Sequence, residues 1–511
     1  MSPLFRISVL SLLLLLGACK GLDTNNENNP DRDAVLSTGA DLEVVLEGGY
    51  LTWWQGVHGA HPVIGLSVAA DAYSMSWSDF GAQRMGAEPR TPYNNRATED
   101  LDYRKIAEVP WAACLSAVSS ANDVLNALDK GISIDNGGPQ DKSLRASAYF
   151  LRGVSWGYLG LIFDQTLLAD EATDLEKDLP FSTYEAAITA AVGELEAAIA
   201  LAQPLGDDFV HRYFNGLNFD GADFAQLSHA YAARFLAQWP RTAVESAGVD
   251  WTAVLVHAEA GLTINFAPLA DGKFWKSYHQ YVFAETGIGP FWARVDQRLI
   301  AALDPTQPAR YPEVSALGEA PLSNSMASSS DARLASDFRF FATNNFPVDR
   351  GEWHFSHYKH NRNISNPGFA GDGATAGPMP AFLVADKELL RAEALLHLGR
   401  KAEALAVLNA GTRVTRGQLP PLNGSATVEA VERAILYERA IELLSAAPMS
   451  LWFDRRRTGT RQDFMNLDAL GSLQTGTPAH LPVPANELRI HLLEPYNFGG
   501  PMDPEGIVRV Y

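Results

Sequence analysis

The sequence has few cysteines and a shortage of positive charge. Two cysteines among 511 residues are too few for a framework of disulfides. Lysine and arginine number 40 against 60 aspartates and glutamates, a formal net charge of −20, which disfavours nucleic-acid binding. Hydrophobic residues, by contrast, make up 47% of the chain. That is enough to bury a large core, and it excludes a disordered protein.

The motifs of several large enzyme classes are also absent. The sequence has no G-x-S-x-G, H-E-x-x-H, G-x-x-x-x-G-K-[ST] or C-x-x-C pattern. The densest histidine group is His354, His357 and His360, in a segment that fits a strand as well as a helix; we expect a hydrogen-bonded cluster there. We therefore predict no catalytic residue, no metal and no cofactor. One enzymatic alternative stays open, because 60 carboxylates could supply the acid pair of a surface glycoside hydrolase.

The N-terminus has the pattern of a lipoprotein signal peptide. An apolar run of residues 7–16 follows Arg6 and is shorter than the roughly 20 helical residues that span a membrane. Small residues then precede Cys19, as in a bacterial lipobox, so we predict a signal peptide over residues 1–18 and diacylation of the Cys19 thiol. An ordinary signal peptide with a chance cysteine is the alternative. Residues 19–37 are predicted to form a flexible tether behind this lipid anchor.

Helical periodicity dominates the rest of the sequence, so we predict one mainly α-helical domain over residues 38–511. Ser182 or Thr183 is expected to cap one helix, and Gly131 to end another. Cys114 lies within a helical pattern and is expected to be a small buried core residue. The helices are predicted at residues 39–54, 107–130, 142–163, 183–203, 223–238, 250–263, 382–398, 402–410 and 427–445.

Several of these helices form pairs that resemble tetratricopeptide units. Alanine and glycine recur where neighbouring helices would cross, and Leu398-Gly399 is expected to form the tight turn within one pair. We predict about four such degenerate pairs; an irregular helical bundle is the alternative. Residues 62–106 and 265–380 break the helical pattern and are expected to be loop-rich insertions. Long loop-rich stretches in a compact fold are commonly functional.

Four segments stand out by their sequence. They are TGADLEVVLEGGY near the start of the domain, LRASAYFLRGVSWGYLGLIFD in the first helix pair, ERAIELLSAAPMSLWFDRRRTG at residues 438–459, and HLPVPANEL at residues 480–488. Together with the lipobox they resemble the SusD/RagB family of nutrient-uptake outer-membrane lipoproteins. The chain departs from the family's pattern at residues 445–449, SAAPM, where Pro448 must interrupt the helix.

This resemblance implies a SusD-like helical fold and a binding function without catalysis. A member of this family would be anchored in the outer membrane by its N-terminal lipid and exposed at the cell surface. It would capture a glycan, such as starch, or a peptide, and deliver it to a TonB-dependent SusC-like transporter. A tetratricopeptide-type structural adaptor without a small-molecule site is the alternative.

The resemblance also implies roles for single residues. Asp71 is expected to form hydrogen bonds with the ligand, and aromatic residues of the loops are expected to stack on it. Those aromatic residues are Trp77, Trp275, Tyr278, Trp292 and Trp353. At the C-terminus we expect a structural role, as an aromatic anchor and an ion-paired turn, for Trp452, Asp454, Arg455 and Arg456.

Overall fold

The computed structural model describes residues 36–75, 78–96, 98, 101–174, 176–271, 273–276, 293–311, 325–342, 355–363 and 377–511. Its helices are α3 (Gly39–His58), α4 (Ala60–Ala69), α5 (Ala82–Met85), α6 (Leu101–Asp129), α7 (Pro139–Ile162), α8 (Tyr184–Ala202), α9 (Gly221–Gln238), α10 (Ala243–Ala247), α11 (Trp251–Glu259), α13 (Gln297–Leu303), α14 (Arg333–Asp337), α15 (Val384–His397), α16 (Lys401–Ala410), α17 (Thr412–Thr415), α18 (Val428–Glu442), α19 (Ser450–Arg457) and α20 (Ala485–Ile490).

The strands are short and the described ones pair two by two. They are β1 (Tyr73–Met75), β2 (Gln165–Thr166), β3 (Ser182–Thr183), β4 (Leu269–Ala270), β5 (Ala293–Val295), β6 (Phe338–Phe340), β7 (Tyr358–His360), β8 (Gly377–Pro378), β9 (Arg461–Gln462) and β10 (Leu473–Gln474). β9 and β10 are parallel, and the pairs β1–β5, β2–β3, β4–β8 and β6–β7 are antiparallel.

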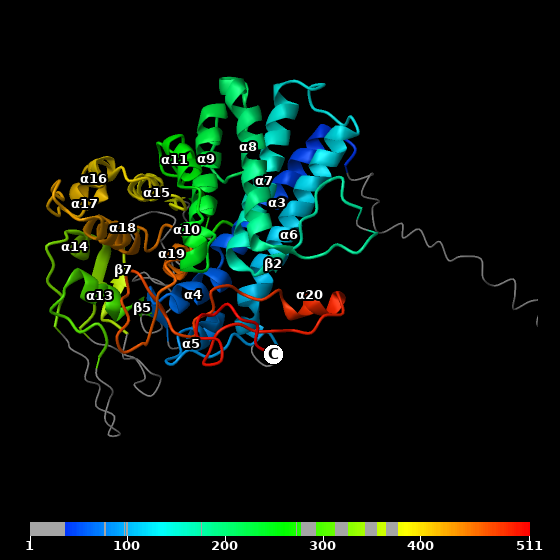
Figure 1. Ribbon diagram of the computed structural model, residues 1–511. Coiled ribbons are helices and arrows are strands. Elements are labelled where there is room, and N and C mark those ends of the chain that lie inside the picture. The colour runs from blue at the N-terminus through cyan, green and yellow to red at the C-terminus, as the bar shows by residue number, and fades with distance from the viewer. Residues whose placement is uncertain are drawn as a thin grey trace, which may run out of the picture.

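Helices packed side by side make up most of the molecule (Figure 1). α7 packs against α6 and α8, and α9 packs against the other side of α8. α11 then connects this row of helices to α15, which packs against α16 and α18. The prediction of a mainly α fold is confirmed. In the part of the chain that is described, no helix has the length and apolar content needed to cross a membrane.

Local polar and glycine residues set the helix ends, and at Thr183 and Gly131 they do so as the sequence predicts. Thr38 caps α3: its hydroxyl accepts a hydrogen bond from the Asp41 N–H, and the Thr38 N–H donates to the Asp41 carboxylate at 2.8 Å. Thr183 caps α8 by accepting a backbone N–H one turn further on, at 3.3 Å. α6 ends at Asp129, and Gly131 follows with a φ of 89°, which lets the chain turn away.

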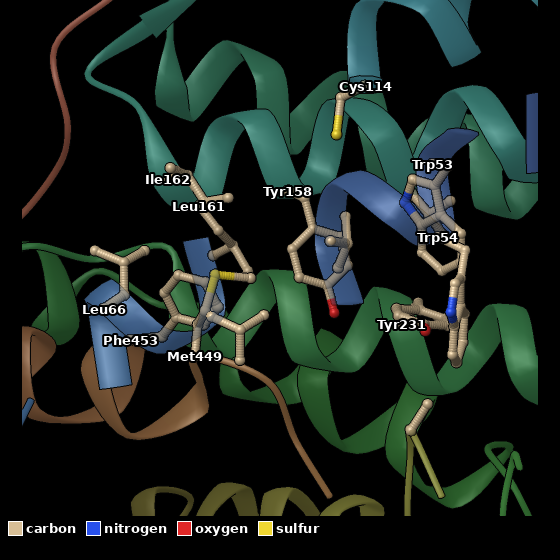
Figure 2. Packing of buried hydrophobic residues seen from close by; sticks show 14 of the residues in the cluster. Trp53, Trp54, Leu66, Cys114, Tyr158, Leu161, Ile162, Tyr231, Met449 and Phe453 are labelled. Atoms are coloured by element: carbon tan, nitrogen blue, oxygen red, sulfur yellow. The ribbon is translucent and has the colours of Figure 1, made fainter. Parts of the chain in front are cut away.

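A continuous core of buried aromatic and aliphatic side chains lies between the helices (Figure 2). Trp53 of α3 is fully buried, and its ring packs edge-on against Tyr231 of α9, with the ring centroids 6.2 Å apart. Cys114 of α6 is also fully buried, and this burial raises the pKa of its thiol. The prediction that Cys114 is a core residue is confirmed.

One stretch that the sequence predicts to be loop is helical. Residues 62–69 belong to α4, so the prediction of a loop-rich insertion beginning at residue 62 is wrong for them. Every residue from Pro62 to Ala69 is buried. A helix buried on all sides has no polar face, and its sequence therefore lacks the amphipathic period that identifies surface helices. α4 packs against α6, which itself begins at Leu101, inside the same predicted loop.

A glycine lets α7 and α9 approach each other closely. A Cβ atom on Gly157 would overlap with the ring of Phe235 in α9, and that ring is fully buried. Because protein cores are packed as densely as organic crystals, the ring has no free space to enter. The distance between α7 and α9 is therefore set by the missing side chain at Gly157.

Replacement of Gly157 by alanine is expected to lower the free energy of unfolding by about 1–3 kcal/mol, because the extra methyl group overpacks the core. Gly193→Ala is the matched control on α8, where a Cβ atom would meet nothing within 4 Å. There alanine should stabilise the helix by about 0.5–1 kcal/mol. Urea denaturation should show opposite shifts for the two variants, and a stabilised Gly157→Ala protein would contradict the close contact.

The arginines of α19 close the ends of other helices. Arg456 is fully buried and donates to the carbonyl oxygens of Leu161 at 2.6 Å and Gln238 at 3.1 Å, the last turns of α7 and α9. Arg455 donates to the carbonyl oxygen of Ala70, which follows α4. The last carbonyls of a helix have no partner within that helix, so these guanidinium groups supply one. One short helix thereby fixes three others.

The remaining residues of the same motif anchor α19 itself. Trp452 is fully buried and donates its Nε1–H to the Pro478 carbonyl oxygen at 3.0 Å. Asp454 accepts a hydrogen bond from Nε of Arg439, a residue of α18, at 2.6 Å. Between the two helices the chain is non-helical around Pro448, because α18 ends at Glu442 and α19 begins at Ser450. The structural role and the aromatic anchor predicted for this motif are confirmed. The predicted ion-paired turn is wrong in form, because the segment is helix α19 and its Arg455 and Arg456 donate to backbone carbonyl oxygens.

Candidate ligand pocket between helices α15 and α18

A pocket of about 320 Å³ opens among helices α15, α16, α17 and α18. Its volume lies at the small end of the range for ligand pockets, roughly 300–1,000 Å³. Part of its wall is aliphatic and comes from α15 and α16, and another part carries arginine side chains. The aliphatic residues include Leu389, Val407 and Leu408, and the arginines are Arg362, Arg413 and Arg416.

The local sequence turns the chain so that two of these arginines reach the pocket. α16 ends at Ala410, and Gly411 leads directly into the single turn of α17. The Thr412 hydroxyl donates to Oε2 of Glu438 at 3.1 Å, which fixes α17 against α18. Arg413 within α17 and Arg416 directly after it then line the pocket.

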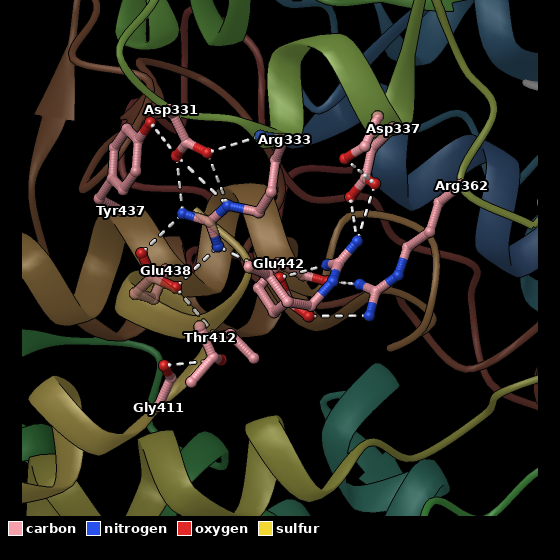
Figure 3. Close-up of polar contacts among 12 residues, drawn as sticks. Asp331, Arg333, Asp337, Arg362, Gly411, Thr412, Tyr437, Glu438 and Glu442 are labelled. Carbon is pink, nitrogen blue, oxygen red and sulfur yellow. Dashed lines mark hydrogen bonds and ion pairs between the residues drawn. The ribbon is translucent and has the colours of Figure 1, made fainter. Parts of the chain in front are cut away.

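A cluster of buried ion pairs, which we call the Arg333 network, lies beside the pocket (Figure 3). Arg333 of α14 is fully buried; it binds Asp331 at 2.7 Å and Glu438 at 2.7 Å, and reaches Glu442 at 3.2 Å. Burial alone would raise the pKa of Asp331, but its hydrogen bonds and ion pair with Arg333 outweigh that effect and hold the pKa below its usual value. The network consists of Asp331, Arg333, Asp337, Arg362, Arg416, Tyr437, Glu438 and Glu442.

Glu442 connects Arg333 to the wall of the pocket. Its buried carboxylate also binds Arg362 at 2.8 Å and Arg416 at 2.7 Å. Asp337 holds Arg416 from another side at 2.8 Å. The side chains of Arg362 and Arg416 are 17% and 31% exposed, whereas Glu442 is 1% exposed. The network therefore holds two guanidinium groups rigidly at the pocket, and both are already paired with carboxylates.

Arg413 differs from the other arginines of the pocket. Its guanidinium forms no hydrogen bond or ion pair with a described residue, and its Nε is shielded from solvent. A shielded N–H group without a partner is unfavourable by about 1–3 kcal/mol. An acceptor on a bound ligand would remove this penalty, so the pocket offers one unpaired cation to a ligand.

The arrangement of the helices agrees with solved structures. A SusD homologue from Bacteroides thetaiotaomicron superposes with a TM-score of 0.61 over 89% of this chain and 96% of its own, at 15% sequence identity. The chain has the SusD-like fold. No protein-family model and no curated protein sequence matches the chain.

Two further structures extend the comparison. A SusD superfamily protein from Bacteroides vulgatus shares the SusD-like fold with a TM-score of 0.56, over 89% of this chain and 97% of its own, at 15% identity. A structure with a bound xylogluco-oligosaccharide has a TM-score of 0.52 and 14% identity, and the match covers 81% of this chain and 82% of that one. At 14–15% sequence identity, these similarities establish a shared fold only.

Asp71 lies deep inside the SusD-like fold, away from solvent. Its carboxylate is fully buried; it binds Arg90 at 2.9 Å and accepts a hydrogen bond from Nε2 of Gln474 at 2.7 Å. Arg298 approaches the same oxygen at 3.4 Å. Asp71 therefore connects three parts of the chain: residues 62–106 through Arg90, residues 265–380 through Arg298, and the C-terminal segment through Gln474. A buried carboxylate with these partners has no exposed surface to offer a ligand, and the structure gives Asp71 a structural role.

Trp275 is the other predicted ligand contact that the structure describes. It is 8% exposed, and its ring packs against Trp54 of α3 with the centroids 5.1 Å apart. Most of this indole is thus used in packing, and its contact with a ligand stays a prediction. The remaining candidates, Trp77, Tyr278, Trp292 and Trp353, and the lipid-anchor residue Cys19, lie outside the described residues.

The histidine-rich segment forms a strand. Tyr358–His360 is β7, and Nδ1 of His357, directly before it, lies 2.8 Å from the Phe341 carbonyl oxygen. Burial lowers the pKa of His357. Within the described ranges, no group of three or more histidine, cysteine, aspartate or glutamate side chains is placed to hold a metal ion. His354 lies outside those ranges.

The residues of the pocket were not predicted from the sequence. The segment ERAIE places Glu438 and Glu442 one turn apart on α18, and both are 1% exposed. Buried acids need cationic partners. Two acids one turn apart on a buried helix face therefore indicate that a cationic side chain lies close to both. The partner, Arg333, lies 105 residues before Glu438, and no pattern in the sequence marks it.

Proposed function

We propose that this protein is a member of the SusD/RagB family that binds a glycan without changing it chemically. The observation that carries the proposal is the SusD-like fold over 89% of the chain. A structure with this fold holds a xylogluco-oligosaccharide. Since a fold alone does not determine function, the ligand-sized pocket beside the Arg333 network adds support from the chemistry of the chain itself.

We further propose that the protein works at the cell surface, anchored in the outer membrane, beside a TonB-dependent SusC-like transporter. The lipobox ending at Cys19 and the polar tether of residues 19–37 support this part of the proposal. The tether leads directly to Thr38, the cap of α3. A lipid at Cys19 would thus hold the helical domain near the membrane and leave its surface free for the glycan and the transporter.

The acids of the pocket favour binding over hydrolysis. A glycosidase needs one carboxyl group that gives up a proton and a second carboxylate that is free to act. Glu438 and Glu442 are both buried, and both bind Arg333, at 2.7 Å and 3.2 Å. These ion pairs leave neither acid available for proton transfer. A surface glycoside hydrolase is therefore the weaker candidate for this pocket.

Isothermal titration calorimetry of the purified protein against neutral oligosaccharides, acidic oligosaccharides and short peptides tests the proposal. At least one glycan is expected to bind, and mass spectrometry of the mixture should find it unchanged. If a neutral glycan binds to the aromatic residues that the sequence predicts as ligand contacts, Trp77→Ala and Trp353→Ala should each weaken its binding by roughly tenfold, about 1.4 kcal/mol. Tyr511→Ala, at a residue 76% exposed, is the control aromatic substitution.

Two results would overturn the proposed function. One is that no glycan in the panel binds, and the other is that the purified protein cleaves a glycan. Detergent extraction of outer membranes, followed by capture of the protein, tests the transporter separately. A large β-barrel transporter should be recovered with the protein, whereas its absence under gentle extraction would contradict the partnership.

A further inference from the structure

We propose that the pocket between α15 and α18 binds the carboxylate of an acidic sugar unit, with Arg413 as the residue that receives it; this rests on the proposed glycan-binding function. The volume of about 320 Å³ suits a single small unit or the end of a chain. The ligand class follows from the one guanidinium group of the pocket that has no partner among the described residues, from its free hydrogen-bonding groups and from its aliphatic wall.

The ion pairs around the pocket leave one cation without a partner among the described residues. Arg362 and Arg416 are bound to the buried carboxylate of Glu442. Glu388, a further acid of the pocket, is paired with Lys387 and Arg391. Every acid that lines the pocket therefore has a cationic partner, and Arg413 has no anionic partner among the described residues. A carboxylate on a ligand would supply the anionic partner that Arg413 lacks.

The acids that line the pocket beside Arg413 favour a carboxylate over a phosphate. A guanidinium group binds a carboxylate through two parallel hydrogen bonds, which adds directional specificity to the charge. A phosphate monoester carries about −1.5 to −2 at neutral pH. Its second charge would face Glu388 and Glu442 with no unpaired cation left to balance it. A monoanion therefore suits Arg413 better than a dianion does.

The neighbouring polar groups suit the hydroxyls of a sugar ring. Oδ1 of Asn265 accepts the Val384 N–H at 2.8 Å, so its amide NH₂ is turned to other partners. The Thr415 hydroxyl donates to the Gly411 carbonyl oxygen at 3.0 Å and keeps its lone pairs for a donor. A ring hydroxyl both donates and accepts hydrogen bonds. The Asn265 amide can donate to it, and the Thr415 hydroxyl can accept from it. Both residues line the pocket.

The aliphatic wall would receive the C–H face of the ring. Leu389, Val407 and Leu408 come from the facing sides of α15 and α16 and form this wall. Removing their surface from water on binding is favourable. A hexuronate, which carries one carboxylate, several hydroxyls and an apolar ring face, combines the three features that the pocket presents.

Calorimetry with a uronic-acid oligosaccharide and its neutral counterpart, such as galacturonate and galactose trimers, tests this inference. The wild-type protein should bind the acidic trimer at least tenfold more tightly than the neutral one. Arg413→Gln, which removes the charge and keeps a side chain of similar length, should weaken the acidic trimer by at least tenfold. Arg400→Gln is the matched control, because Arg400 is exposed, pairs with Glu403 and does not line the pocket.

A second variant guards against an indirect effect of Arg413→Gln. Val407→Phe fills the pocket without changing its charge, and it should abolish binding of the acidic trimer while the thermal unfolding temperature shows that the domain is folded. Unchanged binding of the acidic trimer in both variants would overturn the inference. So would a peptide that binds through its C-terminal carboxylate at Arg413 while the acidic trimer does not bind.

The outcomes separate this inference from the proposed function. If wild-type protein binds a neutral glycan but no acidic one, the proposed function stands and the carboxylate site is refuted. If it binds no glycan of either kind, both fail. Binding of the acidic trimer that depends on Arg413 and on an open pocket supports both.

Discussion

Replacement of Arg333 by methionine is expected to lower the free energy of unfolding by about 3–5 kcal/mol, the range for removing one partner of a buried ion pair. Arg333 is fully buried, and it binds Asp331, Glu438 and Glu442 at once. Methionine has a similar length but no charge, so these acids would stay buried without their common cation. Urea denaturation followed by circular dichroism at neutral pH measures the loss.

Two further variants make this experiment decisive. Arg333→Lys keeps the charge but loses the planar fork that reaches several acids, so an intermediate loss is expected. Arg400→Met removes an exposed arginine, 42% exposed and paired only with Glu403 among the described residues, and should change stability by less than about 1 kcal/mol. If Arg333→Met is no less stable than Arg400→Met, the Arg333 network is not a stabilising element.

Acid is expected to destabilise the protein through His211, on the order of 4–5 kcal/mol between pH 7 and pH 3. His211 is fully buried, and this burial lowers its pKa to about 3 from an ordinary 6.5. Its Nδ1 lies 2.9 Å from the Ser147 hydroxyl, and its Nε2 has no hydrogen-bond partner among the described residues. The ring packs among aromatic side chains, including Phe214 at a centroid distance of 4.9 Å.

The sign of this effect follows from proton binding. Between pH 6.5 and about 3 the unfolded chain carries a proton on His211 and the folded protein does not, so lowering the pH favours unfolding. His211→Phe fills the aromatic cluster without a titratable group, and its stability should fall less on acidification. Ser147→Ala removes the hydrogen bond but leaves the imidazole buried, so its acid sensitivity should match wild type. Equal pH dependence in wild type and His211→Phe would contradict the assignment.

Much of the fold could be predicted because it depends on short stretches of sequence. Thr38 and Thr183 cap helices through side-chain oxygens that reach only one turn along the chain. Gly399, with a φ of 76°, makes the turn between α15 and α16 that the Leu398-Gly399 pair predicts. α4 was not predicted because it lacks such a local signal. It is buried on every side, so its sequence does not alternate between apolar and polar residues with the helical period.

The pocket could not be predicted in the same way. Its arginines come from two separate segments, Arg362 from one and Arg413 and Arg416 from another, and Arg333 belongs to a third. Basic residues near a turn are ordinary on a protein surface, so nothing in the sequence marked them as a set. Asp71 shows the reverse error: an acid in a loop-rich stretch was expected at the surface, and the fold buried it against Arg90.

The sequence by itself determined most of the long helices, the cap at Thr183, the buried Cys114 and the structural role of the motif around Trp452. These features depend on hydrophobic periodicity, on helix caps and on burial of apolar side chains, which residues close together in the sequence determine. Only the tertiary structure decided which charges are paired and which are left for a ligand. Ion pairs form between residues that are far apart in the sequence. Arg333 and Glu442, for example, are 109 residues apart, and helix packing brings them within 3.2 Å of each other. Arg413 became a candidate for binding because every other charge of the pocket had found its partner.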